Sequence, residues 1–395
     1  MHKPRFFTNF PYINVRVINY PNLKVREVYG ILAVFILSLA LRLYNLPSRE
    51  LGIDEGFTLQ ALSLPFPEMF ALLAGVGITP PVYYIFAKLP FAIWGALGVK
   101  LLSAALSAGA AVFTYLLARE LFGRKTAFAA GILFSVMPLA VAYGQHMRTY
   151  ALLMLLFTAS LFFMHRFIST NSTRYLAVLT VINIMLLYTH YQGAFIVFLE
   201  LLYFFWLRKS HKLNLKLPLT YFSATILAAL PWGVFALGQT GSAGTELWLK
   251  FDLINIPYML YKFSAAIDLS TLLQISPLLL LASPIVLAAF AYGIITRILM
   301  CGKFSAGKKG NIFFLWFAIS PIIFSTLISL IIPVLHFRFL SYLLPLFAVG
   351  AGRVIEADKR LAYPLLAAIL AFWLYLDILY YRFSSYEMWN DKIGL

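Results

Sequence analysis

Apolar runs of about 20 residues recur along this 395-residue chain and are separated by short polar or basic turns. About 20 helical residues cross the hydrocarbon core of a bilayer, so runs of this kind indicate transmembrane helices. We place eleven spans near 28–46, 101–118, 127–143, 150–165, 175–190, 192–207, 217–237, 272–296, 312–333, 339–354 and 361–380. The pattern therefore predicts an all-α polytopic membrane protein.

Composition agrees with this class. Hydrophobic residues make up 62% of the chain and charged residues 12%, whereas soluble domains carry about 25% charged residues. With so many spans, the length leaves no room for a large soluble domain. The single cysteine, Cys301, excludes an internal disulfide and a cysteine-rich metal site.

The segment 81–97 admits two interpretations. It is apolar enough to span, but it begins at a proline pair and contains Lys88 and Pro90. If it spans, the basic loops 119–125 and 208–216 face outward, against the tendency of Lys and Arg to stay on the cytoplasmic side. If it lies along the outer surface, most of the 31 Lys and Arg residues face inward. We therefore expect a surface segment, an inner N-terminus and an outer C-terminus.

This topology predicts three parts. Residues 1–27 form a basic cytoplasmic tail without a signal-peptide cleavage site. Residues 28–380 form the transmembrane domain, whose first outer loop is 47–100, and residues 381–395 form a short extracytoplasmic tail. The net charge of +16 sits in short inter-span loops, which indicates membrane orientation and no nucleic-acid partner.

The same topology gathers polar side chains on the outer face of the membrane. An acidic pair follows the first span, and short polar segments end or begin three later spans. Together they supply two carboxylates, two arginines and three histidines, which are Asp54, Glu55, Arg148, Arg338, His146, His190 and His336. Such a cluster beside lipid headgroups favours an enzyme that acts on a lipid-borne substrate.

Several segments resemble motifs of one family in their order and spacing. Leu51-Gly-Ile-Asp-Glu-Gly-Phe-Thr58 resembles its first-loop Asp-Glu motif, and Pro80-Pro-Val-Tyr-Tyr84 is similar to its Pro-Pro-Leu-Tyr-Tyr. Further similar segments are Leu121-Phe-Gly-Arg124, Tyr143-Gly-Gln-His-Met-Arg-Thr-Tyr-Ala151, Tyr188-Thr-His-Tyr191, Leu230-Pro-Trp232 and Arg338-Phe-Leu-Ser-Tyr-Leu-Leu-Pro345. The family is the GT-C membrane glycosyltransferases, in the branch related to dolichyl-phosphate-mannose protein mannosyltransferases.

The resemblance implies a GT-C fold with a helical first outer loop and an inverting transfer of a sugar from a polyprenyl phosphate. The acceptor is a hydroxyl of a protein, a lipid or an envelope glycan outside the cell membrane. Asp54 is then the candidate catalytic base, and Glu55 either positions the acceptor or holds a divalent cation with Asp54. No other cofactor is implied.

The leaving group in such a reaction is a lipid phosphate, which guanidinium groups match in geometry and charge. Arg148 and Arg338 are therefore the candidate phosphate ligands. Three histidines are secondary donors and two tyrosines are candidates to stack on sugar or line the path of the lipid, namely His146, His190, His336, Tyr83 and Tyr84. The chain departs from its relatives at His146, where they often carry Glu, and at Thr79, where many carry His or Lys.

Structural explanations for these residues remain open. The acidic pair also suits the first turn of a helix, and the outer arginines and histidines suit the membrane interface. We expect Lys88 and Lys100 to anchor in headgroups, although a lysine in this loop could also reach phosphate. We expect Glu200 and Asp377 to be either functional or helix-pairing groups. The competing function is a transporter or flippase of lipid-linked substrates, which predicts internal repeats; the sequence shows no repeated halves.

The predicted topology is tested by cysteine labelling in a Cys301→Ser background. Because Asp54 and His190 face outward and 208–216 faces inward, Gln60→Cys should react with an impermeant reagent in intact cells. His211→Cys should react only after the cells are opened. Labelling of His211→Cys in intact cells would overturn the topology.

Overall fold

The computed structural model describes residues 25–75, 79–211, 216–239, 252–267, 282–299, 308–332, 334–356 and 359–382. Within these ranges every regular element is an α-helix or a short 3₁₀ turn, as the sequence predicted. The predictions for residues 1–24, for most of the expected outer loop 238–271, for Cys301 and for residues 383–395 fall outside the described residues.

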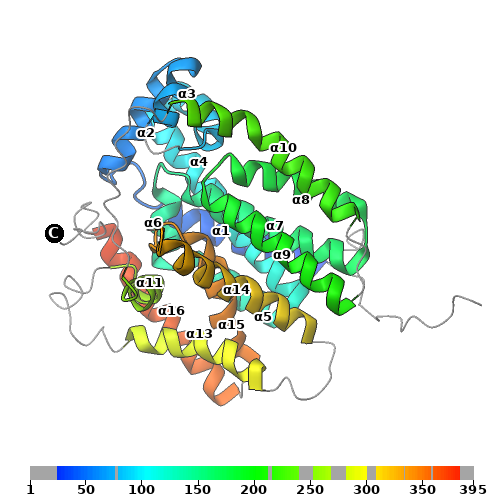
Figure 1. The fold of residues 1–395 in the computed structure, drawn as a ribbon. Helices are drawn as coiled ribbons and strands as arrows, with labels where there is room; N and C mark the ends of the chain where they lie inside the picture. The colour runs from blue at the N-terminus through cyan, green and yellow to red at the C-terminus, as the bar shows by residue number, and fades with distance from the viewer. Residues whose placement is uncertain are drawn as a thin grey trace, which may run out of the picture.

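The helices form a bundle (Figure 1). Their bounds are α1 Val25–Leu43, α2 Ile53–Ser63, α3 Phe66–Gly75, α4 Val82–Phe122, α5 Arg124–Val136, α6 Pro138–Gln145, α7 Tyr150–Thr170, α8 Thr173–Leu187, α9 Gln192–His211, α10 Lys216–Gln239, α11 Asn255–Ala265, α13 Ala282–Leu299, α14 Lys308–Ser329, α15 Leu344–Gly352 and α16 Lys359–Arg382. Two 3₁₀ turns, Ser341–Leu343 and Arg353–Glu356, flank α15.

The core of the bundle is built around α4, which packs against α1, α5 and α7. The second half of α4 buries a series of small side chains, which are Ser103, Ala104, Ser107, Ala108, Ala110 and Ala111. Small residues let helix backbones approach closely, and close packing drives helix association inside a membrane. The α15 segment packs against α5 and α13 and closes the core on another side.

The ambiguous segment 81–97 is joined to the next span in the single 41-residue helix α4, which breaks at Gly95. Gly95 has φ of 60°, a left-handed conformation that glycine adopts without a steric penalty. Across the break, a Cβ on Gly98 would lie 2.1 Å from the carbonyl oxygen of Pro90, so the two arms meet too closely for any side chain. The surface position of the first arm remains a prediction.

Five helices of the described residues are long and apolar enough to cross a membrane, or six if the bent pair α5 and α6 forms one span. The chain is thus a multi-pass membrane protein, although the count of eleven spans is not confirmed. The expected span 127–143 is bent by 57°, with Pro138 opening α6. The expected span 339–354 contains only a 3₁₀ turn and the nine-residue α15.

The first predicted loop is helical, as expected, and two lysines bind it to α4. Lys88 Nζ donates to the carbonyl oxygens of Leu62, at 2.8 Å, and Leu64. Lys100 is buried and donates to the carbonyl oxygens of Leu46 and Arg49, at 3.2 and 2.8 Å. The prediction that Lys100 anchors in headgroups was wrong, because Lys100 is buried and carbonyls in the loop before α2 attract it. For the partly buried Lys88, headgroup anchoring remains a prediction.

Glu200 and Asp377 are both buried within the bundle. Glu200 accepts a hydrogen bond of 2.7 Å from Asn183 Nδ2, which joins α9 to α8. This contact supports the helix-pairing explanation for Glu200. Asp377 lies on α16, and its carboxylate is buried.

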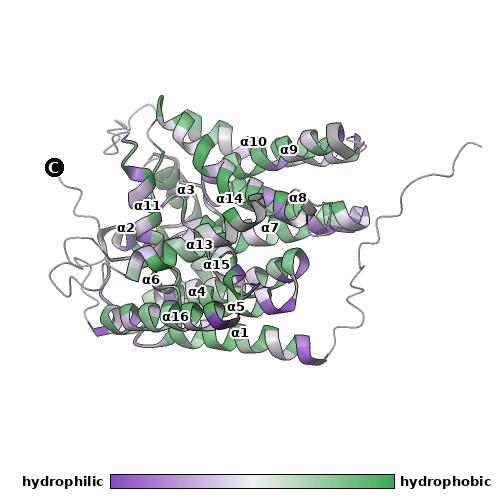
Figure 2. Cartoon of the chain, turned by 90° about the horizontal axis from the view of Figure 1, so that it is seen from below, coloured by the Kyte–Doolittle hydropathy of each residue, from purple (hydrophilic) through white to green (hydrophobic). Residues whose placement is uncertain are grey.

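The elements that carry the predicted site meet at one end of the bundle. Figures 1 and 2 show α2, α3, α6 and α11 gathered at that end. The turn 146–149, between the end of α6 and the start of α7, contacts the start of α2, since the Met147 N–H donates to Glu55 and the Arg148 guanidinium donates to the Asp54 backbone oxygen.

Candidate active site

Asp54 and Glu55 lie in the first turn of α2, where the helix dipole favours negative charge. Neighbouring residues of a helix point about 100° apart, so the two carboxylates enter different surroundings. The Asp54 side chain is 38% exposed, whereas the Glu55 side chain is fully buried. The acidic pair therefore divides into one accessible and one inaccessible carboxylate.

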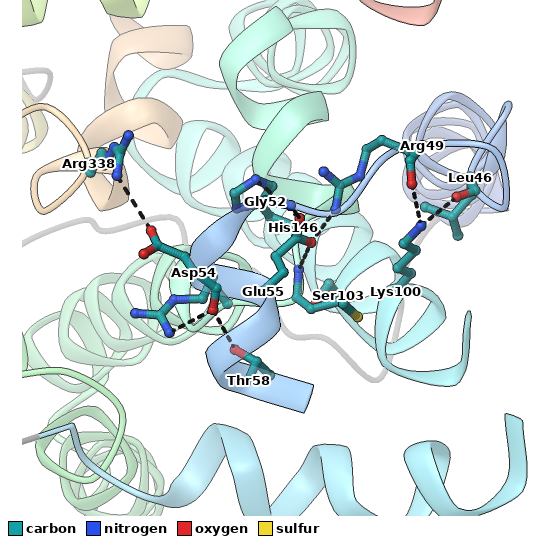
Figure 3. Close-up of polar contacts among 12 residues, drawn as sticks. Leu46, Arg49, Gly52, Asp54, Glu55, Thr58, Lys100, Ser103, His146 and Arg338 are labelled. Carbon is teal, nitrogen blue, oxygen red and sulfur yellow. Dashed lines mark hydrogen bonds and ion pairs between the residues drawn. The ribbon is translucent and has the colours of Figure 1, made fainter. Parts of the chain in front are cut away.

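Glu55 is held from several sides (Figure 3). One oxygen, Oε1, pairs with the Arg49 guanidinium and accepts the Met147 N–H at 2.9 Å. The other, Oε2, accepts the Gly52 N–H at 2.9 Å and lies 3.8 Å from His146 Nε2. These contacts form a buried carboxylate cluster of Glu55 with Arg49, Gly52, His146 and Met147, which joins α2 to the turn between α6 and α7.

The charges in this cluster are balanced at neutral pH. Burial alone disfavours ionised Glu55, but His146, Arg49 and the Gly52 N–H outweigh it and lower the pKa of Glu55 to about 2. Burial lowers the pKa of His146 to about 4, although Glu55 opposes this shift. Glu55 is therefore an anion paired with the Arg49 cation, and His146 is a neutral neighbour.

The residues present do not fit a divalent cation bridging Asp54 and Glu55. Both Glu55 oxygens already face a guanidinium or a backbone N–H, and the Asp54 carboxylate points toward Arg338. Within the part of the chain that the structure describes, no three His, Cys, Asp or Glu side chains form a potential metal-binding group.

Two arginines flank Asp54. Arg338 Nη1 lies 3.5 Å from Asp54 Oδ2, which is a single, long ion-pair contact. Arg148 Nη1 donates to the Asp54 backbone oxygen and to the Tyr84 hydroxyl, both at 3.3 Å. Burial lowers the pKa of Arg148, but Tyr84, Tyr150 and Asp54 raise it above its ordinary value. Arg148 also has a buried Nε without a hydrogen-bond partner, so it retains donor capacity toward a further acceptor.

Two of the predicted histidines meet through an aromatic ring. The Phe339 ring lies 5.7 Å from the ring of His190 and 5.7 Å from that of His336, between ring centroids. Burial, and then the charge of Arg148, lower the pKa of His190 to about 3. His336 Nδ1 accepts the Arg338 N–H at 3.3 Å, which fixes the backbone of Arg338.

The two predicted tyrosines are buried at the start of α4, where Tyr84 contacts Arg148. Tyr83 and Tyr84 are fully buried, with their rings edge to face and their centroids 5.7 Å apart. The Tyr83 hydroxyl is hydrogen bonded to Ser103 at 2.8 Å, and the Tyr84 hydroxyl accepts from Arg148. In this structure they therefore support the arginine, and their predicted contact with sugar or lipid remains untested.

Three residues in this region were missed at the sequence level. Arg49 pairs with Glu55, Phe339 joins the histidines, and Lys262 of α11 is buried with its Nζ 4.9 Å from the Phe337 ring centroid. No sequence pattern points to these three residues, but one pattern does bear on Glu55. Gly52 and Glu55 have the spacing of a capping box, in which the glutamate side chain accepts a hydrogen bond from the backbone N–H before the helix. That signal already favours a structural role for Glu55.

Comparison with known proteins agrees with this architecture. Residues 79–235 match the family model described as dolichyl-phosphate-mannose-protein mannosyltransferase. This range contains Arg148 and His190 but neither Asp54 nor Arg338. Asp54 is connected to the matched region by its contact with Arg148, and Arg338 by its contact with Asp54. No curated protein sequence matches the chain significantly.

Solved structures share the fold at low identity. ArnT from Cupriavidus metallidurans bound to undecaprenyl phosphate has a TM-score of 0.56 at 15% identity, over 86% of this chain and 61% of that one. The apo state of the same protein has a TM-score of 0.59 at 15% identity, over 86% of this chain and 62% of that one. The Archaeoglobus fulgidus oligosaccharyltransferase in complex with Zn and sulfate has a TM-score of 0.52 at 13% identity, over 91% of this chain and 52% of that one.

The chain thus spans between 52% and 62% of the length of these structures. Both proteins are GT-C glycosyltransferases, and the described helices adopt the GT-C fold. The family match and the fold confirm the resemblance predicted from the motifs.

The buried carboxylate cluster predicts that Glu55 mainly stabilises the site. Glu55→Gln leaves the buried Arg49 charge without its counter-ion, and breaking a buried pair costs about 3–5 kcal/mol. The free energy of unfolding in detergent should fall by this order. Glu68→Gln, at an exposed carboxylate on α3, is the matched control and should change it little. Equal effects of the two substitutions would contradict this role.

Two histidines of the site, the partly buried His146 and the buried His190, predict a loss of stability in mild acid. Their folded-state pKa values, about 4 for His146 and about 3 for His190, lie below the unfolded value of about 6.5. The unfolded chain therefore binds more protons as the pH falls through 6.5, and stability decreases. Melting temperatures are compared between about pH 7.5 and 5.5, above the range in which the carboxylates of the unfolded chain begin to bind protons. His146→Gln should flatten the decline in this range. An unchanged slope would contradict the assignment.

Proposed function

We propose that the protein is an inverting glycosyltransferase that moves a sugar from a polyprenyl-phosphate donor to an acceptor hydroxyl. The observation that carries this proposal is the half-exposed carboxylate of Asp54 between Arg148 and Arg338. A base for the acceptor and cations for the leaving phosphate thus lie side by side. The undecaprenyl phosphate bound to the structurally similar ArnT supports the donor class.

The chemistry assigns a separate task to each group. Asp54 accepts the proton of the acceptor hydroxyl, whose oxygen attacks C1 of the sugar. The bond between C1 and the phosphate oxygen breaks, and both bonding electrons leave on the phosphate. Arg148 and Arg338 stabilise the charge that grows there, because guanidinium groups stay protonated and donate hydrogen bonds in a fixed fork.

The remaining predicted residues arrange this site. His336 Nδ1 accepts the backbone N–H of Arg338, and the Tyr84 hydroxyl accepts a hydrogen bond from Arg148. The Nε of Arg148, which is buried without a partner, is a suitable donor toward the phosphate. His190 lies on the same aromatic cluster, and burial keeps it neutral, so it suits hydrogen bonding better than charge neutralisation.

The proposed location is the extracytoplasmic face of the cell membrane. The distribution of Lys and Arg supports it, since the basic loops are expected inside and the segments that carry the proposed site residues are expected outside. A protein, a lipid or an envelope glycan is the proposed acceptor. The alternative, a transporter or flippase, is less consistent with a base beside two phosphate-matching cations and with the glycosyltransferase fold.

Loss of the Asp54 carboxylate should abolish most of the activity. Asp54→Asn keeps the size of the side chain but removes the base, and such groups contribute about 10²–10⁴-fold in rate. The assay incubates membranes with radiolabelled polyprenyl-phosphate sugars and follows transfer of the label to endogenous acceptors. We expect a rate reduction in this range.

Glu68→Gln serves as the control, since it removes an exposed carboxylate from the same predicted loop. Its rate should equal that of the native protein. Native-like transfer in membranes that contain folded Asp54→Asn protein as the only form of the protein would remove Asp54 from the mechanism.

A further inference from the structure

The short helix α6 leads directly into the turn 146–149 that carries Arg148. α6 has eight residues, so it is about 12 Å long, and it runs from a bend of 57° at Pro138 to Gln145. A change of about 10° in the bend would move the far end of a helix of this length by about 2 Å. A group that fixes the bend therefore also helps to fix the position of Arg148.

The bend frees backbone carbonyls that need a partner. A proline has no N–H, so a proline in a broken span leaves carbonyl oxygens of the preceding turn free, and inside a membrane another group must bind them. Arg42 of α1 supplies that group. Its Nη1 donates to the Ser135 oxygen at 2.9 Å, and its Nη2 makes a longer contact of 3.5 Å with the Phe134 oxygen. Arg42 is fully buried, so these contacts are made away from bulk water.

The same guanidinium is held by α1 and α4. Its Nη1 also donates to the Ser38 oxygen of α1 at 3.0 Å, and its Nε donates to the Ser107 hydroxyl of α4 at 2.6 Å. The Ser107 hydroxyl donates in turn to the Ala140 oxygen of α6 at 3.3 Å. Hydrogen bonds from an ionised donor are about twice as strong as neutral ones. Arg42 thus joins α1, α4 and the bend in one network.

Arg42 also contacts the far end of α6. A Cβ on Gly144 would lie 2.7 Å from Arg42 Nε, so α6 passes against the arginine side chain at a position that has room only for glycine. The next residue, Gln145, donates from Nε2 to the backbone oxygens of Arg42 and Tyr44, both at 2.9 Å. Both ends of α6 are therefore attached to the end of α1, and Arg148 lies three residues beyond the second attachment.

We propose that Arg42 is a positioning residue of the site, whose guanidinium sets the bend between α5 and α6 and thereby places Arg148 against the donor phosphate. The inference rests on the proposed function and adds a group that lies behind the site. An ionisable side chain within a membrane span is costly, and here it satisfies the carbonyls of the bend. Since a misplacement of about 1 Å can cost about 10²-fold in rate, the bend governs activity.

The positional part of the proposal is tested without a ligand. Arg42→Met retains an unbranched side chain but removes every donor, so the turn 146–149 should be held less firmly. Hydrogen–deuterium exchange of the purified full-length protein in detergent should become at least about tenfold faster in peptides that cover 134–149. This is the effect expected for losing one hydrogen bond to a charged group. Unchanged exchange in these peptides overturns the proposal.

Asn183→Leu is the matched control, because it also removes a buried polar contact between helices, that of Asn183 on α8 with Glu200 on α9. Its exchange should rise in α8 and α9 and stay native-like over 134–149. Equally faster exchange over 134–149 in both variants would show a general loosening of the bundle and would overturn the proposal. If Arg42→Met does not fold, Gln145→Met, which removes only the attachment at the end of α6, replaces it with the same expectations.

The functional part is tested by titrating folded protein with undecaprenyl phosphate. Arg42→Met should weaken binding about tenfold, because it misplaces one charged donor, and in an Arg148→Gln background it should have no further effect. Equal weakening in both backgrounds, or native-like binding by Arg42→Met, overturns the proposal. Asn183→Leu should bind like the native protein, since a loss of stability alone does not change the affinity of the folded fraction.

The two experiments separate this inference from the proposed function. If the native protein does not bind undecaprenyl phosphate, the proposed donor class fails and the functional part fails with it, whereas hydrogen exchange still decides whether Arg42 fixes the turn. If the native protein binds and Arg42→Met changes neither exchange nor affinity, the role of Arg42 alone fails.

Discussion

The buried negative charge of Glu55 is the constraint on which the site depends. A carboxylate that is removed from water must be compensated, and Glu55 obtains a guanidinium from Arg49 and backbone N–H groups from Gly52 and Met147. These partners come from the loop before α2 and from the turn between α6 and α7. By satisfying one buried charge, the chain fixes the relative position of two segments about 90 residues apart.

The proposed catalytic groups lie directly beside this cluster. Asp54 precedes Glu55, and Arg148 follows Met147, so each of these two candidate residues is next to a group that is held in place. Lys100 extends the support, since it binds the carbonyl oxygen of Arg49 and thereby joins α4 to the same loop. The site therefore combines a rigid buried half around Glu55 with a more accessible half around the Asp54 carboxylate.

Sequence patterns predicted the helical class and the gathering of Asp54, Arg148 and Arg338, because apolar period and charge distribution follow directly from membrane physics. They did not separate the roles of Asp54 and Glu55, since adjacency along the chain conceals the rotation between neighbouring residues of a helix. The break at Gly95 was also missed, because a single residue with positive φ does not change the pattern of apolar residues along the chain. Arg49 carried no motif, and only its tertiary contact with Glu55 identifies it.

The pairing of Asp54 with Arg338 joins positions 284 residues apart in the chain. A membrane protein is synthesised and inserted from its N-terminus, so the first carboxylate reaches the membrane long before the last arginine exists. Until the segment around Arg338 emerges, the proposed base has no second arginine beside it. On the proposed function, the nascent chain would be inactive until most of the bundle has assembled.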